Sequence, residues 1–107
     1  MILSGQSGVI EMKNYQNDEF HRWEINSTCD QVRIMSSVFE TEYNFDFLQI
    51  NDKNYTGENI TIHQIINESF FVVQFTSNDN QTRSGFKLNW ECQPTGNTVS
   101  AYNVGAN

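Results

Sequence analysis

The sequence predicts an all-β protein, an antiparallel sandwich of two β-sheets, and three observations carry this prediction. Apolar side chains alternate with polar ones in short segments, as in strands with one buried face. Turn-forming residues separate these segments at regular intervals. In no window of eleven residues do the apolar positions follow a helical period. Eight phenylalanines, four tyrosines and two tryptophans supply large side chains for a core of modest size.

The expected strands begin at residue 9. In the segment 20–25, Trp23 and Ile25 share the inner face and alternate with outward polar residues. Residues 70–75 are apolar at nearly every position, which fits a strand covered on both faces or one central to a sandwich. The full set of expected strands is residues 9–12, 20–25, 31–36, 45–50, 60–62, 70–75 and 85–92.

The remaining segments are polar and are expected to be loops or turns. Residues 1–6 have the character of a lead-in, because Gly5 and Gly8 interrupt regular structure. Pro94 ends the last strand, and small polar residues follow it. We therefore expect one domain over residues 1–93 and a C-terminal linker or edge extension over residues 94–107. The expected loops and turns are residues 13–19, 26–29, 51–57, 63–68 and 77–84.

The net charge of −7 argues against nucleic acids and anionic membranes as primary partners. It is compatible with a cationic partner or a bound metal ion. No run of about 18 apolar residues is present, so no membrane span is expected. The apolar start of the chain is too short for a signal peptide, so a secreted protein would have its signal upstream or already removed.

Asparagine and cysteine bear on the compartment. Five positions fit Asn-x-Ser/Thr, whereas the composition would give roughly two, and all five fall at expected turns or strand ends. This mild excess predicts an extracellular glycoprotein. Cys29 and Cys92 would form one disulfide in an oxidising compartment and two buried thiols in the cytosol. The glycan acceptors are Asn26, Asn54, Asn59, Asn67 and Asn80.

An acidic corner precedes the strand 45–50. Asp46 shares a strand face with Leu48 and Ile50, and a buried carboxylate without a partner would be costly. Glu42 lies four residues earlier, so the two carboxylates can meet at one rim of a sheet. Oxygen ligands of this kind suit a hard cation such as Ca²⁺. The alternative is a solvated loop with no metal.

In order and spacing, these pieces resemble a CUB domain over residues 8–92. The resemblance implies a CUB-like jelly-roll and an extracellular module. Two departures stand out: His21 occupies the place of a usual cysteine, and the cysteine expected ahead of the strand 45–50 is missing, so the family does not supply the pairing of Cys29 and Cys92. The motifs are Gly8-Val9-Ile10, Asn14-Tyr15, Trp23-Glu24-Ile25, Val32 with Ile34, Phe39-x-x-Glu42, Phe45-Asp46-Phe47-Leu48-Gln49-Ile50, Phe75-Thr76-Ser77-Asn78 and Gly85-Phe86-Lys87-Leu88-Asn89-Trp90.

Many CUB domains bind Ca²⁺ at one end of the sandwich, and the resemblance implies the ligands. They become Glu42, Asp46 and Asn78, supported by Tyr15. Asn78 replaces the family's aspartate, which removes one charge and predicts a weaker site, and Asp79 is the next candidate along the chain. The alternative is an acidic corner held by hydrogen bonds alone.

Catalysis is not expected. His21 and His63 have no metal-type spacing, and no nucleophile motif is present. Glu40 and Glu42 could act as a carboxylate pair, but a small sandwich offers no deep cleft around them.

Three hypotheses of function remain. The first is a protein-binding or adhesion module of a larger secreted or cell-surface protein, whose acidic corner receives a basic side chain of the partner. The second is a glycosylated structural subunit of an extracellular filament or coat, in which the tail after Pro94 contacts neighbours. The third is a carbohydrate-binding module, which would need an exposed aromatic cluster.

Overall fold

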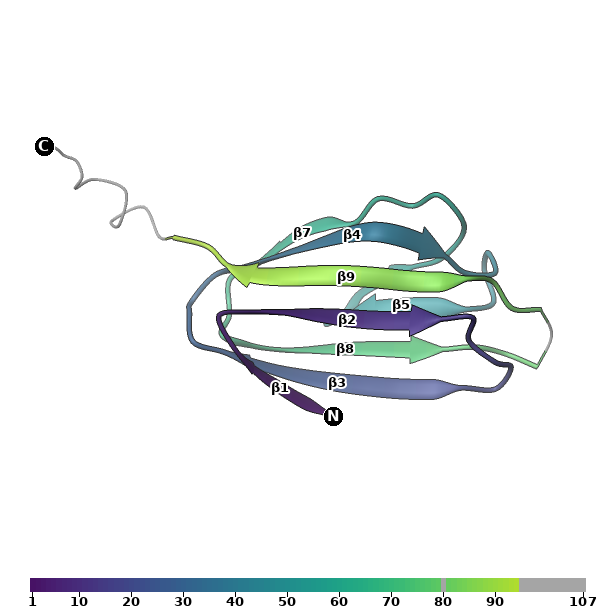
Figure 1. Ribbon diagram of the computed structural model, residues 1–107, viewed down its shortest axis with the longest axis horizontal. Helices are drawn as coiled ribbons and strands as arrows, with labels where there is room; N and C mark the ends of the chain where they lie inside the picture. Colours follow the sequence, from purple (N-terminus) through teal and green to yellow (C-terminus); the bar gives the residue numbers. More distant parts are fainter. Residues whose placement is uncertain (80, 95–107) are drawn as a thin grey trace, which may run out of the picture.

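The computed structural model describes residues 1–79 and 81–94. In this part of the chain all regular structure is β-strand, and the strands form a two-layered sandwich (Figure 1). No helix in these residues is long and apolar enough to cross a membrane. The strands are β1 (Ile2–Gly5), β2 (Ser7–Lys13), β3 (Phe20–Ser27), β4 (Val32–Glu40), β5 (Phe47–Ile50), β6 (Lys53–Tyr55), β7 (His63–Ile66), β8 (Phe70–Thr76) and β9 (Gly85–Cys92).

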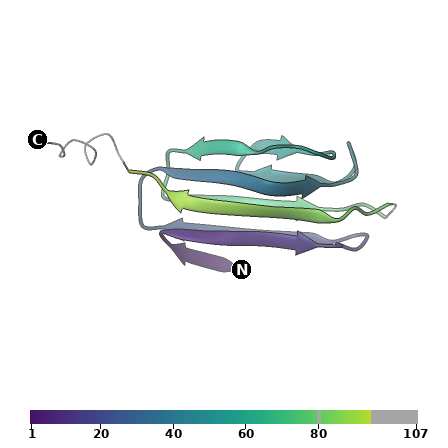
Figure 2. The same ribbon diagram turned by 45° about the horizontal axis from the view of Figure 1, so that its top comes forward.

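One sheet has the strand order β1-β3-β8-β5-β6, and the other has the order β2-β9-β4-β7. The two layers are visible in Figure 2, where β2, β9 and β4 lie in front of the other sheet. Neighbouring strands are antiparallel except β1, which pairs in parallel with β3. The predicted antiparallel two-sheet sandwich is confirmed.

Aromatic side chains from the two sheets meet in the core. Phe71 and Phe75 of β8 contact Trp90 and Phe86 of β9, at ring centroid distances of 6.3 and 5.2 Å. All four are buried. They face inward because side chains alternate along a strand, and burial of each such side chain stabilises the fold by about 1.5–3 kcal/mol.

The disulfide ties the sheets at the end opposite to the loops 14–19 and 41–46. Cys29, in the connection between β3 and β4, is bonded to Cys92 at the end of β9, with the sulfurs 2.08 Å apart and the Cα atoms 5.8 Å apart. The bridge closes a loop across a sequence separation of 63 residues.

Several local expectations are corrected. Residues 1–6 contain β1 rather than a lead-in, and residues 51–57 contain β6. Residues 60–62 are not a strand. The expected turn 63–68 instead contains β7, because residues 63–66 pair with β4. Ile62 is still buried, and its amide bonds to Ser36 Oγ at 2.8 Å.

A further correction concerns the start of β5. It begins at Phe47, because residues 43–45 turn. Of the two readings of residues 70–75, the central strand is right, since β8 lies between β3 and β5. Its burial alternates, with Phe70 exposed and Phe71 buried, so the strand is not covered on both faces.

The expected tail falls mostly outside the described residues. Pro94 is exposed, and residues 95–107 lie outside the described part of the chain. The domain boundary at residue 94 therefore remains an expectation.

Candidate functional site

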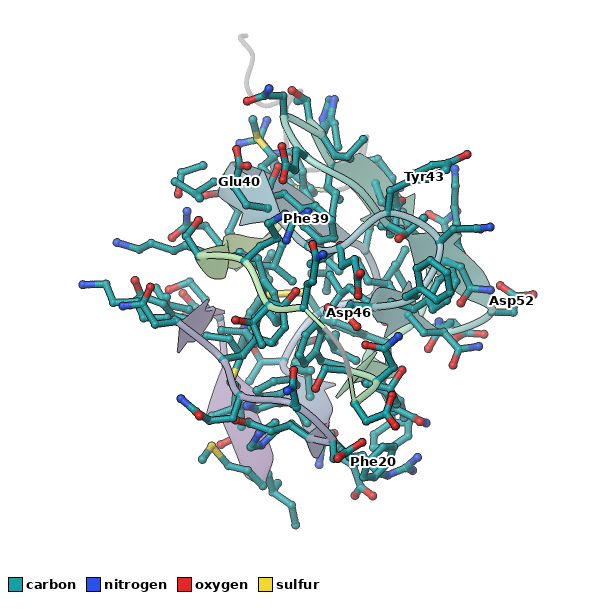
Figure 3. All side chains as sticks on the ribbon, turned by 90° about the vertical axis from the view of Figure 1, so that its right-hand side faces the viewer. Phe20, Phe39, Glu40, Tyr43, Asp46 and Asp52 are labelled. Carbon is teal, nitrogen blue, oxygen red and sulfur yellow. A yellow bond between two sulfur atoms is a disulfide. The ribbon has the colours of Figure 1, made fainter. Side chains whose placement is uncertain are left out.

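Three connections meet at one end of the sandwich: residues 14–19 between β2 and β3, residues 41–46 between β4 and β5, and residues 77–84 between β8 and β9 (Figure 1). We call this the loop end. Figure 3 looks onto it, with Asp46 near the centre of the view and Phe20 and Tyr43 at its margins. The predicted acidic corner lies here because β4 ends and β5 begins at this end of the sandwich.

Asp46 is fully buried directly before β5. Its Oδ2 accepts a hydrogen bond of 2.5 Å from the hydroxyl of Tyr15, and its Oδ1 accepts one of 3.0 Å from the backbone amide of Asn78. Burial and the bond to Asp46 raise the pKa of the Tyr15 hydroxyl above its ordinary value, so it remains a neutral donor. Asp46 therefore receives a bond from each of the other two connections at the loop end.

Glu42 lies in the same network and is 8% exposed. Its backbone amide donates to the Tyr15 hydroxyl at 3.2 Å, and its carbonyl accepts from the Asp46 amide at 3.0 Å. Its side-chain Oε1 is buried, and no donor among the described residues bonds to it. A buried carboxylate oxygen with no donor is costly, so this atom is poised for a cation or a water molecule.

Two threonines fix the backbone of residues 41–46. The carbonyl of Asp46 accepts hydrogen bonds from the hydroxyls of Thr41, at 3.2 Å, and Thr56, at 2.8 Å. The Thr56 hydroxyl also accepts from the amide of Asn44, at 2.8 Å, and Asn44 has a φ of 68°. Asparagine tolerates this left-handed conformation, so the turn that brings Glu42 back toward Asp46 is encoded locally.

The connection that carries Asn78 is braced by residues 16–19. The Asn78 carbonyl accepts from the Asp18 amide at 2.7 Å. Ser77 exchanges bonds with Glu19, as its amide donates to the Glu19 carbonyl and its Oγ accepts from the Glu19 amide. The Asn78 amide is thereby held toward Asp46.

A positive charge lies beside the carboxylates. The Arg83 guanidinium is paired with Glu58, and its pKa is raised first by that hydrogen bond, with a further contribution from the charge of Glu42. Sequence reasoning missed this pair, because a surface arginine 25 residues from its partner leaves no signal in the sequence.

The residues at the corner fit a calcium ion in kind. They supply two carboxylates and an asparagine, and oxygen ligands of this type are those that Ca²⁺ takes. No cluster of three or more His, Cys, Asp or Glu side chains that could hold a metal exists among the described residues. A Ca²⁺ ion would therefore need oxygens of Asn78, backbone carbonyls or water besides Glu42 and Asp46.

The other predicted site residues fall elsewhere. Asp79 is exposed, and no hydrogen bond or ion pair in the described part of the chain joins it to the corner. His21 contacts Glu19 at 2.5 Å and stacks on Trp23. The sequon asparagines in the described residues are exposed, whereas Asn80 lies outside that part. The exposed asparagines are Asn26, Asn54, Asn59 and Asn67.

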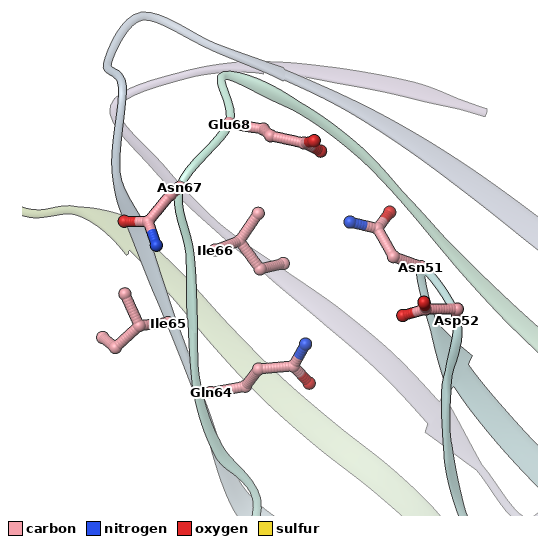
Figure 4. Close-up of a pocket in the computed structure, with 7 residues that line it drawn as sticks. All are labelled: Asn51, Asp52, Gln64, Ile65, Ile66, Asn67 and Glu68. Atoms are coloured by element: carbon pink, nitrogen blue, oxygen red, sulfur yellow. The ribbon is translucent and has the colours of Figure 1, made fainter.

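Two surface hollows lie away from the loop end. One groove of about 570 Å³ runs between the turn after β5 and β7, where Asn51 and Asp52 face Gln64 and Glu68 (Figure 4). Two carboxylates and three amides line it together with isoleucines. The other, of about 290 Å³, lies on the outer face of β6, β5 and β8.

Solved structures share this fold. The MASP-1 CUB2 domain bound to Ca²⁺ matches with a TM-score of 0.76 and 15% identity over 85% of this chain and 96% of that chain. The CUB1-EGF-CUB2 domain of human MASP-1/3 has a TM-score of 0.76 and 16% identity, over 85% of this chain and 40% of that chain. The full extracellular region of zebrafish Gpr126/Adgrg6 has a TM-score of 0.73 and 18% identity, over 85% of this chain and 14% of that chain.

This chain is thus comparable in length to one CUB domain and much shorter than the multidomain chains. No family model and no curated protein sequence matches it. The structural likeness establishes the fold, which agrees with the resemblance found in the sequence.

Proposed function

We propose that this chain, which has a CUB-like fold, is an extracellular protein-binding module of a larger secreted or cell-surface protein. Its loop end would hold a Ca²⁺ ion and receive a basic side chain of the partner. The orphaned Oε1 of Glu42, buried beside the Tyr15–Asp46 pair, is the single observation that carries this proposal.

The protein supplies the two anionic ligands already gathered. Glu42 and Asp46 are linked through the Tyr15 hydroxyl and through the bond from the Asp46 amide to the Glu42 carbonyl, so they cannot separate without breaking buried hydrogen bonds. Ca²⁺ bound there would neutralise two buried negative charges and hold the connections 41–46 and 77–84 together. Asn78 in place of a carboxylate predicts weak affinity, roughly 10⁻⁴ to 10⁻³ M.

Charge supports a basic partner. The chain has a net charge of −7, and Arg83, beside the corner, is already paired with Glu58. A lysine or arginine brought by a partner would gain charge-assisted hydrogen bonds at the rim, and the acidic surface would speed its approach. The MASP-1 CUB2 domain, which shares this fold, is bound to Ca²⁺ in its structure, and this supports a Ca²⁺ ion in the present chain.

Thermal unfolding with Ca²⁺ or with a chelator tests the metal part. At millimolar Ca²⁺ the melting temperature should rise in the wild type, because Ca²⁺ binds the folded state. Asp46→Ala should remove the rise and Asn78→Asp should enlarge it. The matched control is Asp52→Ala, which removes the same charge from an exposed residue of the β5–β6 turn and should keep the rise. Equal rises in Asp46→Ala and wild type would place any Ca²⁺ elsewhere.

Binding to an immobilised lysine-rich peptide tests the docking part. The wild type should bind more strongly with Ca²⁺ than with chelator at equal ionic strength, and Glu42→Gln should lose that difference. Binding that is equal in both conditions and insensitive to Glu42→Gln would mean that attraction to the peptide reflects net charge alone.

A further inference from the structure

We infer that the hollow on the outer face of β5, β6 and β8 is the seat of the first sugar of an N-linked glycan carried by Asn54. We call it the sugar seat. Its lining residues are Phe47, Gln49, Asn54, Gln74 and Thr76. The inference depends on the extracellular location proposed above, and it concerns a face that the Ca²⁺ corner does not use.

Strand register builds the seat around the acceptor. Asn54 of β6 lies opposite Gln49 of β5, which lies opposite Gln74 of β8. Two positions further along the strands, and so on the same face, Phe47 lies opposite Thr76. Because alternate side chains share a sheet face, these five side chains all point outward, and the other four lie on one side of Asn54.

The lining chemistry suits a neutral sugar. Within the described residues, no hydrogen bond engages the side-chain amides of Gln49, Asn54 or Gln74, so each retains donors and acceptors for hydroxyl and acetamido groups. Phe47 is half-exposed and has no ring contact in the described part of the chain, which leaves a flat apolar surface for the C–H face of a pyranose ring. Among the described residues, no charged side chain lines the hollow.

The volume of the hollow and the position of the glycan acceptor both indicate that the occupant is the first sugar on Asn54. A volume of about 290 Å³ lies at the lower limit of small-molecule pockets, which are about 300–1,000 Å³, so the hollow fits one sugar rather than a chain of them. Asn54 begins the sequon Asn54-Tyr55-Thr56 and is exposed. A sugar on Asn54 is tethered beside the lining, and tethering makes even weak contacts effective.

The modification is the ordinary transfer from a lipid-linked oligosaccharide. The Asn54 amide nitrogen bonds to the anomeric carbon, the bond from that carbon to the lipid pyrophosphate breaks, and the amide loses one proton. The lipid pyrophosphate leaves with the electron pair of the broken bond, so no oxidation or reduction takes place.

The test compares three glycoforms of the protein made in a eukaryotic secretory host. One keeps whole glycans, one is trimmed by an endoglycosidase to a single N-acetylglucosamine per site, and one is stripped by an amidase, which converts each occupied asparagine to aspartate. The single-sugar form should melt at the temperature of the whole form, and the stripped form should melt about 4 °C lower. An Asn54→Gln variant lacks the sugar without gaining a charge, and its comparison with Asn54→Asp corrects for the charge left by the amidase.

Two variants locate the effect. One variant is Phe47→Ala, and the other combines Gln49→Ala with Gln74→Ala. In each variant the single-sugar and stripped forms should have the same melting temperature, even if the substitution itself changes that temperature. The matched control is Asn59→Gln, which removes an exposed acceptor outside the seat and should keep the difference. A difference that persists in both seat variants would overturn the inference.

Site occupancy separates this inference from the proposed function. Glycans at Asn26, Asn59 or Asn67 with none at Asn54 would overturn the sugar seat and leave the extracellular proposal intact. If the protein with a bare Asn54 bound free N-acetylglucosamine in the hollow, the seat would belong to a ligand's sugar, and our assignment would also be wrong. An absence of glycans at every sequon would contradict both proposals.

Discussion

The Tyr15 hydroxyl lies 2.5 Å from Asp46 Oδ2, which joins two buried residues 31 positions apart in the sequence. The Tyr15 ring packs edge-on against Phe75, with ring centroids 4.8 Å apart, so packing in the core fixes the orientation of the hydroxyl. The same oxygen accepts from the amide of Glu42. One tyrosine thus links the core of the sandwich to the carboxylate of Asp46 and to the backbone of Glu42, the two acidic residues of the candidate Ca²⁺ site.

Tyr15→Phe should therefore destabilise the fold. The substitution keeps the ring but leaves Asp46 Oδ2 and the Glu42 amide without this partner in a buried setting, and the expected loss is about 1–3 kcal/mol of unfolding free energy. Chemical denaturation measures it. Tyr43→Phe is the matched control, because Tyr43 is 71% exposed and should change the unfolding free energy little. Equal effects of the two substitutions would contradict the role given to Tyr15.

We expect Cys29 and Cys92 to be bridged in the native protein. Non-reducing peptide mapping should recover the linked pair. Reduction should lower the unfolding free energy by on the order of 4 kcal/mol in the chain-entropy model, because the bridge closes a loop across 63 residues. Recovery of both cysteines as alkylatable thiols without reductant would count against the pair.

Low pH should destabilise the contacts of residues 16–19 at the loop end by protonating Glu19. The hydrogen bond from His21, and then that from the Gln16 amide, lower the pKa of Glu19 below its ordinary value. A carboxylate with a lowered folded-state pKa stabilises the fold above its ordinary pKa of 4.5 and loses this contribution as the pH falls through the folded value. The stability difference between wild type and Glu19→Gln should therefore shrink between about pH 6 and pH 3.

Denaturation curves across that pH range supply the measurement. Glu11→Gln is the control, since the Glu11 side chain is exposed and makes no hydrogen bond or ion pair among the described residues. Its difference from wild type should stay flat. A pH-independent difference for Glu19→Gln would mean that Glu19 braces the loop only through its backbone.

Glycans should be present on at least two of the five sequons when the protein comes from its native source. The described acceptors are all exposed, as attachment requires. Intact mass before and after glycosidase treatment gives the number of occupied sites. An unchanged mass would remove the main support for an extracellular location.

The sequence predicted the sandwich because the two-residue period of a strand marks its buried face. It put Asp46 on the face of Leu48 and Ile50 but left a solvated loop open as the alternative, whereas the structure buries Asp46 directly before β5. Asp46, Leu48 and Ile50 share one face, and all three are fully buried. The inward faces of β3 and β9 follow from the same local rule.

What the sequence missed depends on pairing between distant segments. Nothing in residues 1–6 shows that β1 will find a parallel partner in β3, and nothing in residues 60–66 fixes the register of β7 against β4. The Arg83–Glu58 pair and the threonine bonds to the Asp46 carbonyl arise only once the connections at the loop end have folded together. The exposed face around Phe47 likewise needs three strands in register.

Titration calorimetry with calcium chloride tests the central claim most directly. The wild type, freed of metal by a chelator and then dialysed, should bind one Ca²⁺ with a dissociation constant of roughly 10⁻⁴ to 10⁻³ M, and Asn78→Asp should bind it several-fold more tightly because it restores a charge. An absence of binding heat and of any Ca²⁺-dependent melting shift at millimolar Ca²⁺, in both proteins, would contradict the account. The Tyr15, Glu42 and Asp46 cluster would then be a corner held by hydrogen bonds alone.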